Sequence, residues 1–120
     1  MALVHAGPAE AVSLMDGTGK PQDTMSSAIV KTAEFQAIHL IVAEGAEIAR
    51  HAVPGPITLY CLEGHVRLNL DHSQVELHEG HWLYLEGGEP HAVSGLKFSR
   101  VLLTIMALPA RKPEAAPSLV

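Results

Sequence analysis

The sequence predicts an all-β domain, either a barrel or a sandwich, from three observations. About eight short apolar segments follow one another between residues 28 and 108, separated by turns rich in Gly, Pro and acidic residues. β-branched and aromatic residues recur in these segments, and no helical stretch lies between them. The 120 residues allow one domain. Many short strands at close spacing are typical of barrels and sandwiches.

The expected strands cover residues 28–32, 35–43, 57–62, 65–70, 74–77, 82–85, 91–93 and 98–108. Only the last is long enough for a helix, and its β-rich sequence before Pro109 favours a strand. The barrel is thus expected within residues 28–108. Residues 1–27 are rich in Gly, Ala, Ser, Pro and Thr, which indicates an arm with little regular structure. The Pro/Ala-rich residues 109–120 are expected to form a frayed tail.

Several expected strands are apolar on both alternating faces, for example residues 82–85 and 101–106. A strand with one wet face should alternate between apolar and polar residues, so both faces of these strands are expected to be covered. In a chain this small the second cover is often another subunit, which predicts a homodimer. The alternative is a sandwich core covered by the N-terminal arm.

Composition narrows the partners and the compartment. The formal net charge is -5 and no Lys/Arg cluster occurs, which argues against nucleic acid and against an anionic membrane surface. The single cysteine, Cys61, excludes a disulfide within one chain and favours a reducing compartment. Neither a signal-peptide pattern nor an apolar run of about 18–20 residues is present. We therefore expect a cytoplasmic protein.

Two glycine-and-histidine segments have informative spacing. The first contains, in order, Gly45, His51, Val53, Ile57 and Gly64, and the second contains Gly80, Glu86, Gly88, His91 and Gly95. The spacing resembles the two conserved motifs of the cupin superfamily, G-x5-H-x-H-x3,4-E-x6-G and G-x5-P-x-G-x2-H-x3-N. The resemblance covers residues 35–106 and is to small, single-domain, RmlC-like bacterial cupins. It implies an all-β, double-stranded β-helix barrel, also called a jelly roll.

The resemblance also implies a ligand set for one divalent metal ion (Zn, Ni, Mn or Fe) inside the barrel. His51 matches the first family ligand and His91 the fourth, so we expect the two to face each other in the interior. The second histidine position is Val53, and the glutamate position is Ile57. Because divalent sites usually have three or four protein ligands, two imidazoles alone would form a weak site.

Other residues could complete that site. His39 lies on the strand that leads into the first motif, and its alternatives are a hydrogen-bonded barrel histidine or a surface residue. Cys61 shares side-chain parity with Ile57 and so should face inward, where it could also be an inert small hydrophobe. Met106 is the weakest candidate. The remaining histidines of the barrel segment, His65, His72, His78 and His81, are expected to be solvated.

Two function classes follow from this site. In the first, the chain is a binding module whose barrel mouth holds a small, partly apolar molecule, with His51 and His91 as polar contacts. The apolar lining would be Val53, Ile57, Leu59 and Val93. In the second, the chain is a metal-dependent enzyme of the oxygenase or isomerase type with a reduced metal site. Because a histidine and the glutamate are replaced, the sequence favours the first class and leaves catalysis open.

Overall fold

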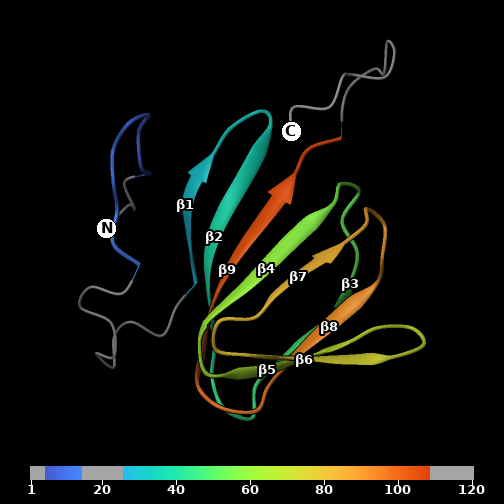
Figure 1. Ribbon diagram of the computed structural model, residues 1–120. Helices are drawn as coiled ribbons and strands as arrows, with labels where there is room; N and C mark the ends of the chain where they lie inside the picture. The colour runs from blue at the N-terminus through green and yellow to red at the C-terminus, as the bar shows by residue number, and fades with distance from the viewer. Residues whose placement is uncertain (1–4, 15–25, 109–120) are drawn as a thin grey trace.

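The computed structural model describes residues 5–14 and 26–108, and the strands within residues 26–108 form two antiparallel sheets. The five-stranded sheet has the order β1-β2-β9-β4-β7, and the four-stranded sheet has the order β3-β8-β5-β6 (Figure 1). The strands are β1 (Ser27–Lys31), β2 (Phe35–Val42), β3 (Glu47–His51), β4 (Ile57–Glu63), β5 (His65–Asn69), β6 (Gln74–His78), β7 (Trp82–Leu85), β8 (His91–Gly95) and β9 (Ser99–Met106). The described residues contain no helix, which confirms the all-β expectation.

Strand β3 was missed in the sequence, while the eight expected strands are present with small differences at their ends. Its residues are exposed apart from Ile48, so it lacks the apolar alternation by which strands are found. It forms because β8 pairs with it, with Ile48 opposite Val93. A β-bulge lies between Ile48 and His51, at the end of the strand.

The hydrophobic core fills the space between the two sheets. Alternate residues of β4 point inward, and Ile57, Leu59 and Cys61 are at most 2% exposed. They pack in one cluster with Val42, Val66, Leu68, Leu77, Leu85, Val93 and Val101 from the other strands. Burial of this apolar surface is the main stabilising contribution to such a domain.

A tight turn at Gly64 connects the two sheets between β4 and β5. Gly64 has a φ of 96°, a backbone conformation that L side chains rarely adopt. A Cβ at this position would also collide with the carbonyl of Phe98 and with Ser99. The next residue, His65, donates its backbone N–H to Ser99 Oγ at 2.8 Å. The turn therefore fixes where β5 begins.

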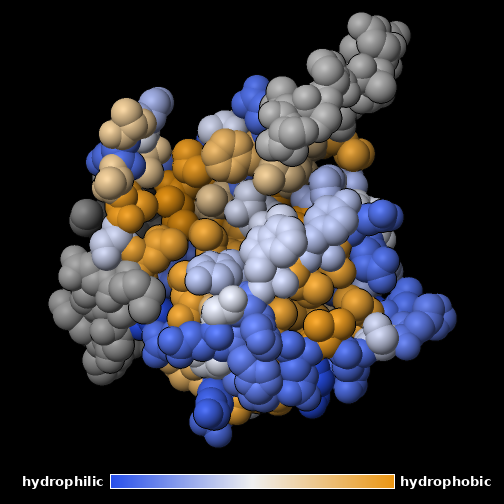
Figure 2. All heavy atoms as spheres, in the orientation of Figure 1, coloured by the Kyte–Doolittle hydropathy of each residue, from blue (hydrophilic) through white to orange (hydrophobic). Residues whose placement is uncertain are grey.

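The outer face of the five-stranded sheet is apolar and aromatic. Tyr60 is 38% exposed, Trp82 61% and Tyr84 50%, and all three lie on this face because they alternate with core residues. Figure 2 shows apolar residues gathered over β2, β9 and β4, with hydrophilic residues around the β5–β6 hairpin below them. Strands β7 and β9, which the sequence identified as apolar on both faces, carry apolar residues on the outer face as well as toward the core.

The segment before the barrel contributes a contact but no strand in its described part. Residues 5–14 contain no helix or strand, and the backbone N–H of Ala6 donates to the carbonyl of Ile29 at 2.8 Å. The rest of the expected arm, residues 1–4 and 15–25, and the expected tail, residues 109–120, lie outside the described residues. No helix capable of crossing a membrane occurs in the part of the chain that the structure describes.

Candidate functional site

The structure brings His51 and His91 together. They lie directly opposite each other on β3 and β8, and their ring centroids are 4.5 Å apart with the planes inclined by 56°. The β-bulge makes this pairing, because an unbroken register from Ile48 would put Arg50 opposite His91. Arg50 instead donates to the Asp71 carboxylate at 2.6 Å. His91 is 5% exposed and His51 is exposed, so the pair runs from the interior to the surface.

The loop after β3 and the loop before β8, which adjoin the two histidines, are connected by a hydrogen bond. The backbone N–H of Gly88, before β8, donates to the carbonyl of Val53, after β3, at 2.8 Å. Gly88 has a φ of 83°, and a Cβ at Gly87 would collide with the carbonyl of Pro54. Gly87 and Gly88 therefore allow the close approach of the loops next to the histidine pair.

The hydrogen bonds of the two rings are equivalent. His51 Nδ1 lies 3.0 Å from the carbonyl oxygen of Ala49, and His91 Nδ1 lies 3.0 Å from that of Glu89. A carbonyl oxygen only accepts, so both Nδ1 atoms carry a proton. In the neutral imidazoles this leaves both Nε2 atoms with a lone pair. The pair can therefore accept two hydrogen bonds or donate two lone pairs to a metal ion.

The expected apolar lining residues belong to the packed core. Ile57, Leu59 and Val93 are 2%, 1% and 3% exposed, and the partly buried Val53 packs against them. The family ion does not fit this set, since two of its four ligand positions are the aliphatic Val53 and Ile57. Of the four family ligand positions, only those of the two imidazoles are occupied by residues that can bind a metal ion.

The further candidate ligands lie elsewhere. His39 alternates with the inward residues Leu40 and Val42, which places it on the outer face of the five-stranded sheet, away from the histidine pair. Cys61 is fully buried in the core, near the end of β4 that is farther from Ile57. Its backbone forms hydrogen bonds with Gly80 and His81 in the turn before β7. Burial raises the pKa of the Cys61 thiol, which keeps it protonated at neutral pH.

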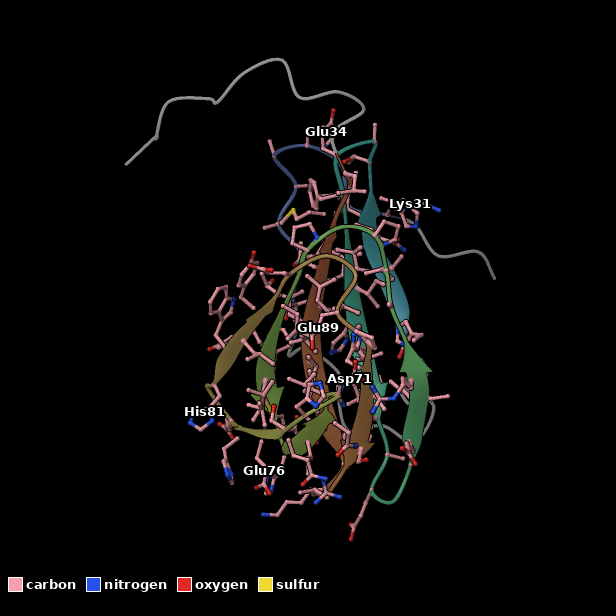
Figure 3. The ribbon with its side chains drawn as sticks, turned by 90° about the vertical axis from the view of Figure 1, so that its right-hand side faces the viewer. Lys31, Glu34, Asp71, Glu76, His81 and Glu89 are labelled. Carbon is pink, nitrogen blue, oxygen red and sulfur yellow. The ribbon has the colours of Figure 1, made fainter. Side chains whose placement is uncertain are left out.

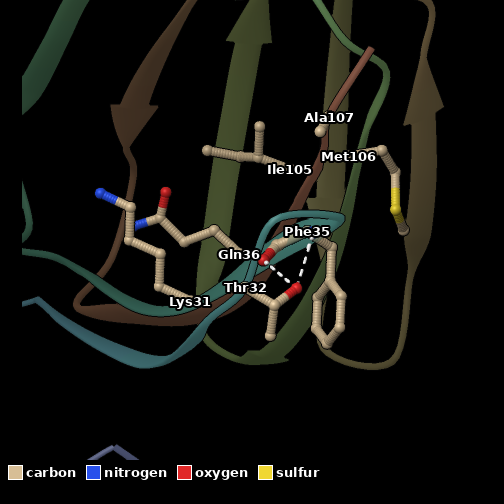
Figure 4. A pocket seen from close by; sticks show the side chains of 7 residues that line it. All are labelled: Lys31, Thr32, Phe35, Gln36, Ile105, Met106 and Ala107. Atoms are coloured by element: carbon tan, nitrogen blue, oxygen red, sulfur yellow. Dashed lines mark hydrogen bonds between the residues drawn. The ribbon is translucent and has the colours of Figure 1, made fainter. Parts of the chain in front are cut away.

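Met106, the weakest candidate, is 38% exposed at the end of β9 and lines a surface pocket of about 130 Å³. Figure 4 shows this pocket at the start of β2, where Thr32 Oγ holds the preceding turn by hydrogen bonds with Phe35. Its lining is Lys31, Thr32, Phe35, Gln36, Ile105, Met106 and Ala107. Neither histidine of the pair lines it.

Sequence reasoning missed a second group of side chains. His65 was expected to be solvated, but its side chain is only 18% exposed and lies against Glu76 and His78. The signal was available in the sequence: Glu76 and His78 are two apart on a strand and share a face. A hairpin with its turn at residues 70–73 then places His78 opposite His65.

Taken together, the fold and the site define an antiparallel jelly-roll barrel with a pair of histidines facing each other on its four-stranded sheet. The Cupin domain family matches residues 38–102, more than half of the chain. The chain therefore belongs to the cupin family, as the motif spacing indicates. No curated protein matches this sequence.

Solved structures share the fold. A conserved protein of unknown function from Streptococcus pyogenes is 24% identical, with a TM-score of 0.71, over 96% of this chain and all of its own. A cupin superfamily protein from Desulfitobacterium hafniense is 18% identical, with a TM-score of 0.65, over 68% of this chain and 74% of its own. An RmlC-like cupin from Shewanella frigidimarina is 19% identical, with a TM-score of 0.64, over 71% and 77%.

Proposed function

We propose that this cupin is a binding module that holds a small hydroxylated molecule with an apolar body at His51 and His91. The observation that carries the proposal is the shared orientation of the two rings, each with Nδ1 bonded to a backbone carbonyl at 3.0 Å. In the neutral form each Nε2 atom accepts a hydrogen bond, and the two ring centroids are 4.5 Å apart. Their complement is a ligand with two hydroxyl groups on neighbouring atoms, such as a vicinal diol or a catechol.

The surroundings of the pair favour the same ligand class. The partly buried Val53, two residues after His51, offers an aliphatic contact, and binding sites commonly combine such surfaces with a few polar groups. Because Ile57, Leu59 and Val93 are almost completely buried, the ligand has to lie over this cluster, beside the exposed His51, and has to be small.

A metal-dependent enzyme of the oxygenase or isomerase type is the second candidate. Metal-ligating histidines usually donate their other ring N–H to a carbonyl or carboxylate, as both of these histidines do. The aliphatic residues at the two other family ligand positions weigh against this candidate. Cupins commonly bind a metal, so the experiment below includes a metal ion.

Nitrogen-15 spectra of the imidazoles test the proposal directly. Catechol is titrated into the tag-free protein, with benzene as the probe that has the same ring and lacks hydroxyl groups. We expect catechol to shift Nε2 of His51 and His91, and benzene to leave both unshifted. His51→Ala should abolish the effect at His91, and His72→Ala, an exposed histidine outside the pair, should preserve it. Equal responses to both probes, or Nε2 shifts produced by Zn²⁺ alone, would overturn the proposal.

We also propose that a second copy of the chain covers the outer face of the five-stranded sheet. Apart from the Arg100–Glu63 ion pair at one end, the outward residues of β2, β9, β4 and β7 carry no carboxylate, lysine or arginine. Such a face meets its own copy across a two-fold axis without like-charge repulsion, and its aromatic residues are typical of interface centres.

Light scattering at micromolar concentration tests the dimer. We expect twice the chain mass for the wild type and for His72→Glu, and 12.8 kDa for Trp82→Glu, because Trp82 is 61% exposed on this face. A wild-type mass of 12.8 kDa would contradict the proposal.

The cytoplasm is the compartment that we propose. Cys61 is free and buried, as expected in a reducing environment. The net charge of -5 supports a small-molecule ligand and neither a nucleic acid nor a membrane as partner.

A further inference from the structure

We propose that His65, Glu76 and His78 form a second site, which binds a divalent transition-metal ion on the outside of the barrel. We call these three residues the outer site. It lies on the β5–β6 hairpin, whereas His51 and His91 lie on β3 and β8. Figure 3 shows Glu76 and His81 at one lower corner of the molecule and Glu89, the residue whose carbonyl orients His91, nearer its middle.

The register of the hairpin brings the three side chains to one face. His65 is directly opposite His78, and Arg67 is opposite Glu76. The intervening residues Val66 and Leu77 are buried in the core. Since side chains alternate along a strand, His65, Glu76 and His78 all point away from the core, on the outer face of the four-stranded sheet.

The separations of the ligand atoms suit one small ion. His65 Nε2 lies 2.8 Å and His78 Nε2 lies 3.9 Å from Glu76 Oε1, and one ligand atom from each residue lies within 4.8 Å of the others. His65 Nε2–H donates to Glu76 Oε1 in this arrangement, so a binding ion takes the place of that proton, which is released to solvent. Tetrahedral zinc with bonds of 2.0–2.2 Å holds its ligand atoms roughly 3.3 Å apart. The two observed distances lie on either side of that value, so side-chain rotations have to bring the three ligand atoms to a common spacing around the ion.

The backbone holds the first ligand in place before any ion binds. The N–H of His65 donates to Ser99 Oγ at 2.8 Å, and its carbonyl accepts the N–H of Leu96 at 2.9 Å. The rings of His65 and His78 are stacked, with centroids 4.0 Å apart and an interplanar angle of 27°. An ordered ring at an 18% exposed side chain loses little conformational freedom when a metal binds.

A third histidine, His81, supports the outer site without being a ligand. Its Nδ1 accepts the backbone N–H of His78 at 3.0 Å, and its ring meets that of His78 edge-on at 5.4 Å. In the neutral ring the proton is then on Nε2, which leaves no lone pair for a metal. The ion would therefore have three protein ligands and one position open to water or a second ligand.

The donor set selects the class of ion. Two imidazoles and one carboxylate suit Zn²⁺, Ni²⁺ or Cu²⁺, whereas Mg²⁺ and Ca²⁺ prefer sites built from oxygen ligands. An ion bridging β5 and β6 would bind the folded hairpin and not the unfolded chain. It would consequently raise the melting temperature.

Calorimetric titration of the tag-free, full-length chain with Zn²⁺ tests the proposal. We expect one ion per chain, with Mg²⁺ giving no heat of binding. His78→Ala and Glu76→Gln should each weaken Zn²⁺ binding by at least about tenfold, because even the loss of a residue that is hydrogen-bonded to a metal ligand typically has an effect of this size. His72→Ala, the matched exposed histidine, and the His51→Ala/His91→Ala double variant should bind Zn²⁺ as the wild type does.

Cobalt gives an independent readout of the same ligands. Co²⁺ should produce the visible absorption of a tetrahedral site in the wild type and in the His51→Ala/His91→Ala variant, and lose it in Glu76→Gln. Melting curves without metal show whether each variant is folded. If His78→Ala is unfolded, Glu76→Gln provides the test of the ligand set, because the Glu76 side chain is exposed. Absence of Zn²⁺ binding in the wild type, or binding that survives Glu76→Gln and His78→Ala but not His51→Ala/His91→Ala, would overturn the proposal.

Discussion

His51 and His91 on β3 and β8 can be compared with His65 and His78 on β5 and β6, because both are cross-strand pairs in the same four-stranded sheet. The rings are 4.5 Å apart in the first pair and 4.0 Å apart in the second. Their neighbours differ. The first pair faces the apolar core, and both Nδ1 atoms are bonded to backbone carbonyls. The second faces outward and has the Glu76 carboxylate within 2.8 Å of an imidazole nitrogen.

The difference shows that the neighbours of a histidine pair decide its chemistry. A carboxylate supplies the negative charge and the third ligand that a divalent ion needs. Aliphatic neighbours supply neither, but they supply the contact surface that an organic ligand needs. Family spacing identified the first pair as the metal position, whereas the side chains present favour the second pair for metal and the first for an organic ligand.

The largest expected effect on stability is at the Gly64 turn, which fixes the start of β5 and hence the position of His65 in the second pair. Gly64→Ala should lower the free energy of unfolding by about 3 kcal/mol or more, since it combines a strained positive φ with a backbone collision. Gly80→Ala is the matched control, because Gly80 also has a positive φ, of 90°, but has nothing within 4 Å of an added Cβ. Denaturant unfolding measures both. Equal losses in the two variants would show that the collision, and hence the fixed start of β5, is unimportant.

A smaller effect concerns Cys61. Its pKa is raised by burial, so above the pKa of the unfolded thiol, about 8.5, the unfolded chain loses a proton that the folded chain keeps. This contribution to stability is fully present below that pH and falls as the pH rises, by up to about 1.4 kcal/mol per pH unit. The difference in unfolding free energy between wild type and Cys61→Ala, measured from pH 7 to 10.5, should shrink accordingly. A constant difference would contradict the burial argument.

The smallest expected effect is at the N-terminal arm. Deleting residues 1–20 should cost no more than about 1 kcal/mol, because residues 5–14 contain no strand and the backbone hydrogen bond from Ala6 to Ile29 joins them to β1. Thermal melting of the truncated chain measures this. A loss above roughly 2 kcal/mol would mean that the arm packs as part of the domain. Zn²⁺ binding at the outer site should be the same in both chains.

The sequence was sufficient for the fold and for the expectation that His51 and His91 lie opposite each other. Alternating apolar residues revealed eight of the nine described strands, and glycine spacing located His51 and His91. β3 escaped because its pairing with β8, and not its own apolar pattern, forms it. The outer site escaped because an exposed histidine carries no hydrophobic signal. Only the hairpin register joins His65 to Glu76 and His78.

The orientation of His39 also depended on strand parity that the sequence left undetermined. All residues around it on β2 are partly buried apart from buried Val42, so both faces of the strand look alike in the sequence. Pairing with β9 resolves the ambiguity, because Leu40 is opposite the buried Val101 and His39 is opposite Leu102.

Restoring the two missing family ligands tests most directly the claim that Val53 and Ile57 keep the first pair from binding metal. Val53→His and Ile57→Glu should each destabilise the metal-free protein by about 1–3 kcal/mol, because each buries a polar group without a partner. These variants and their combination are made in a Glu76→Gln background, which removes a ligand of the outer site, and are melted with and without Zn²⁺, Mn²⁺ and Ni²⁺. The double variant should gain about 2.7 kcal/mol at an ion concentration of 100 times Kd, and the unmodified pair much less. Equal gains with the unmodified pair would contradict the claim and favour the metal-dependent enzyme.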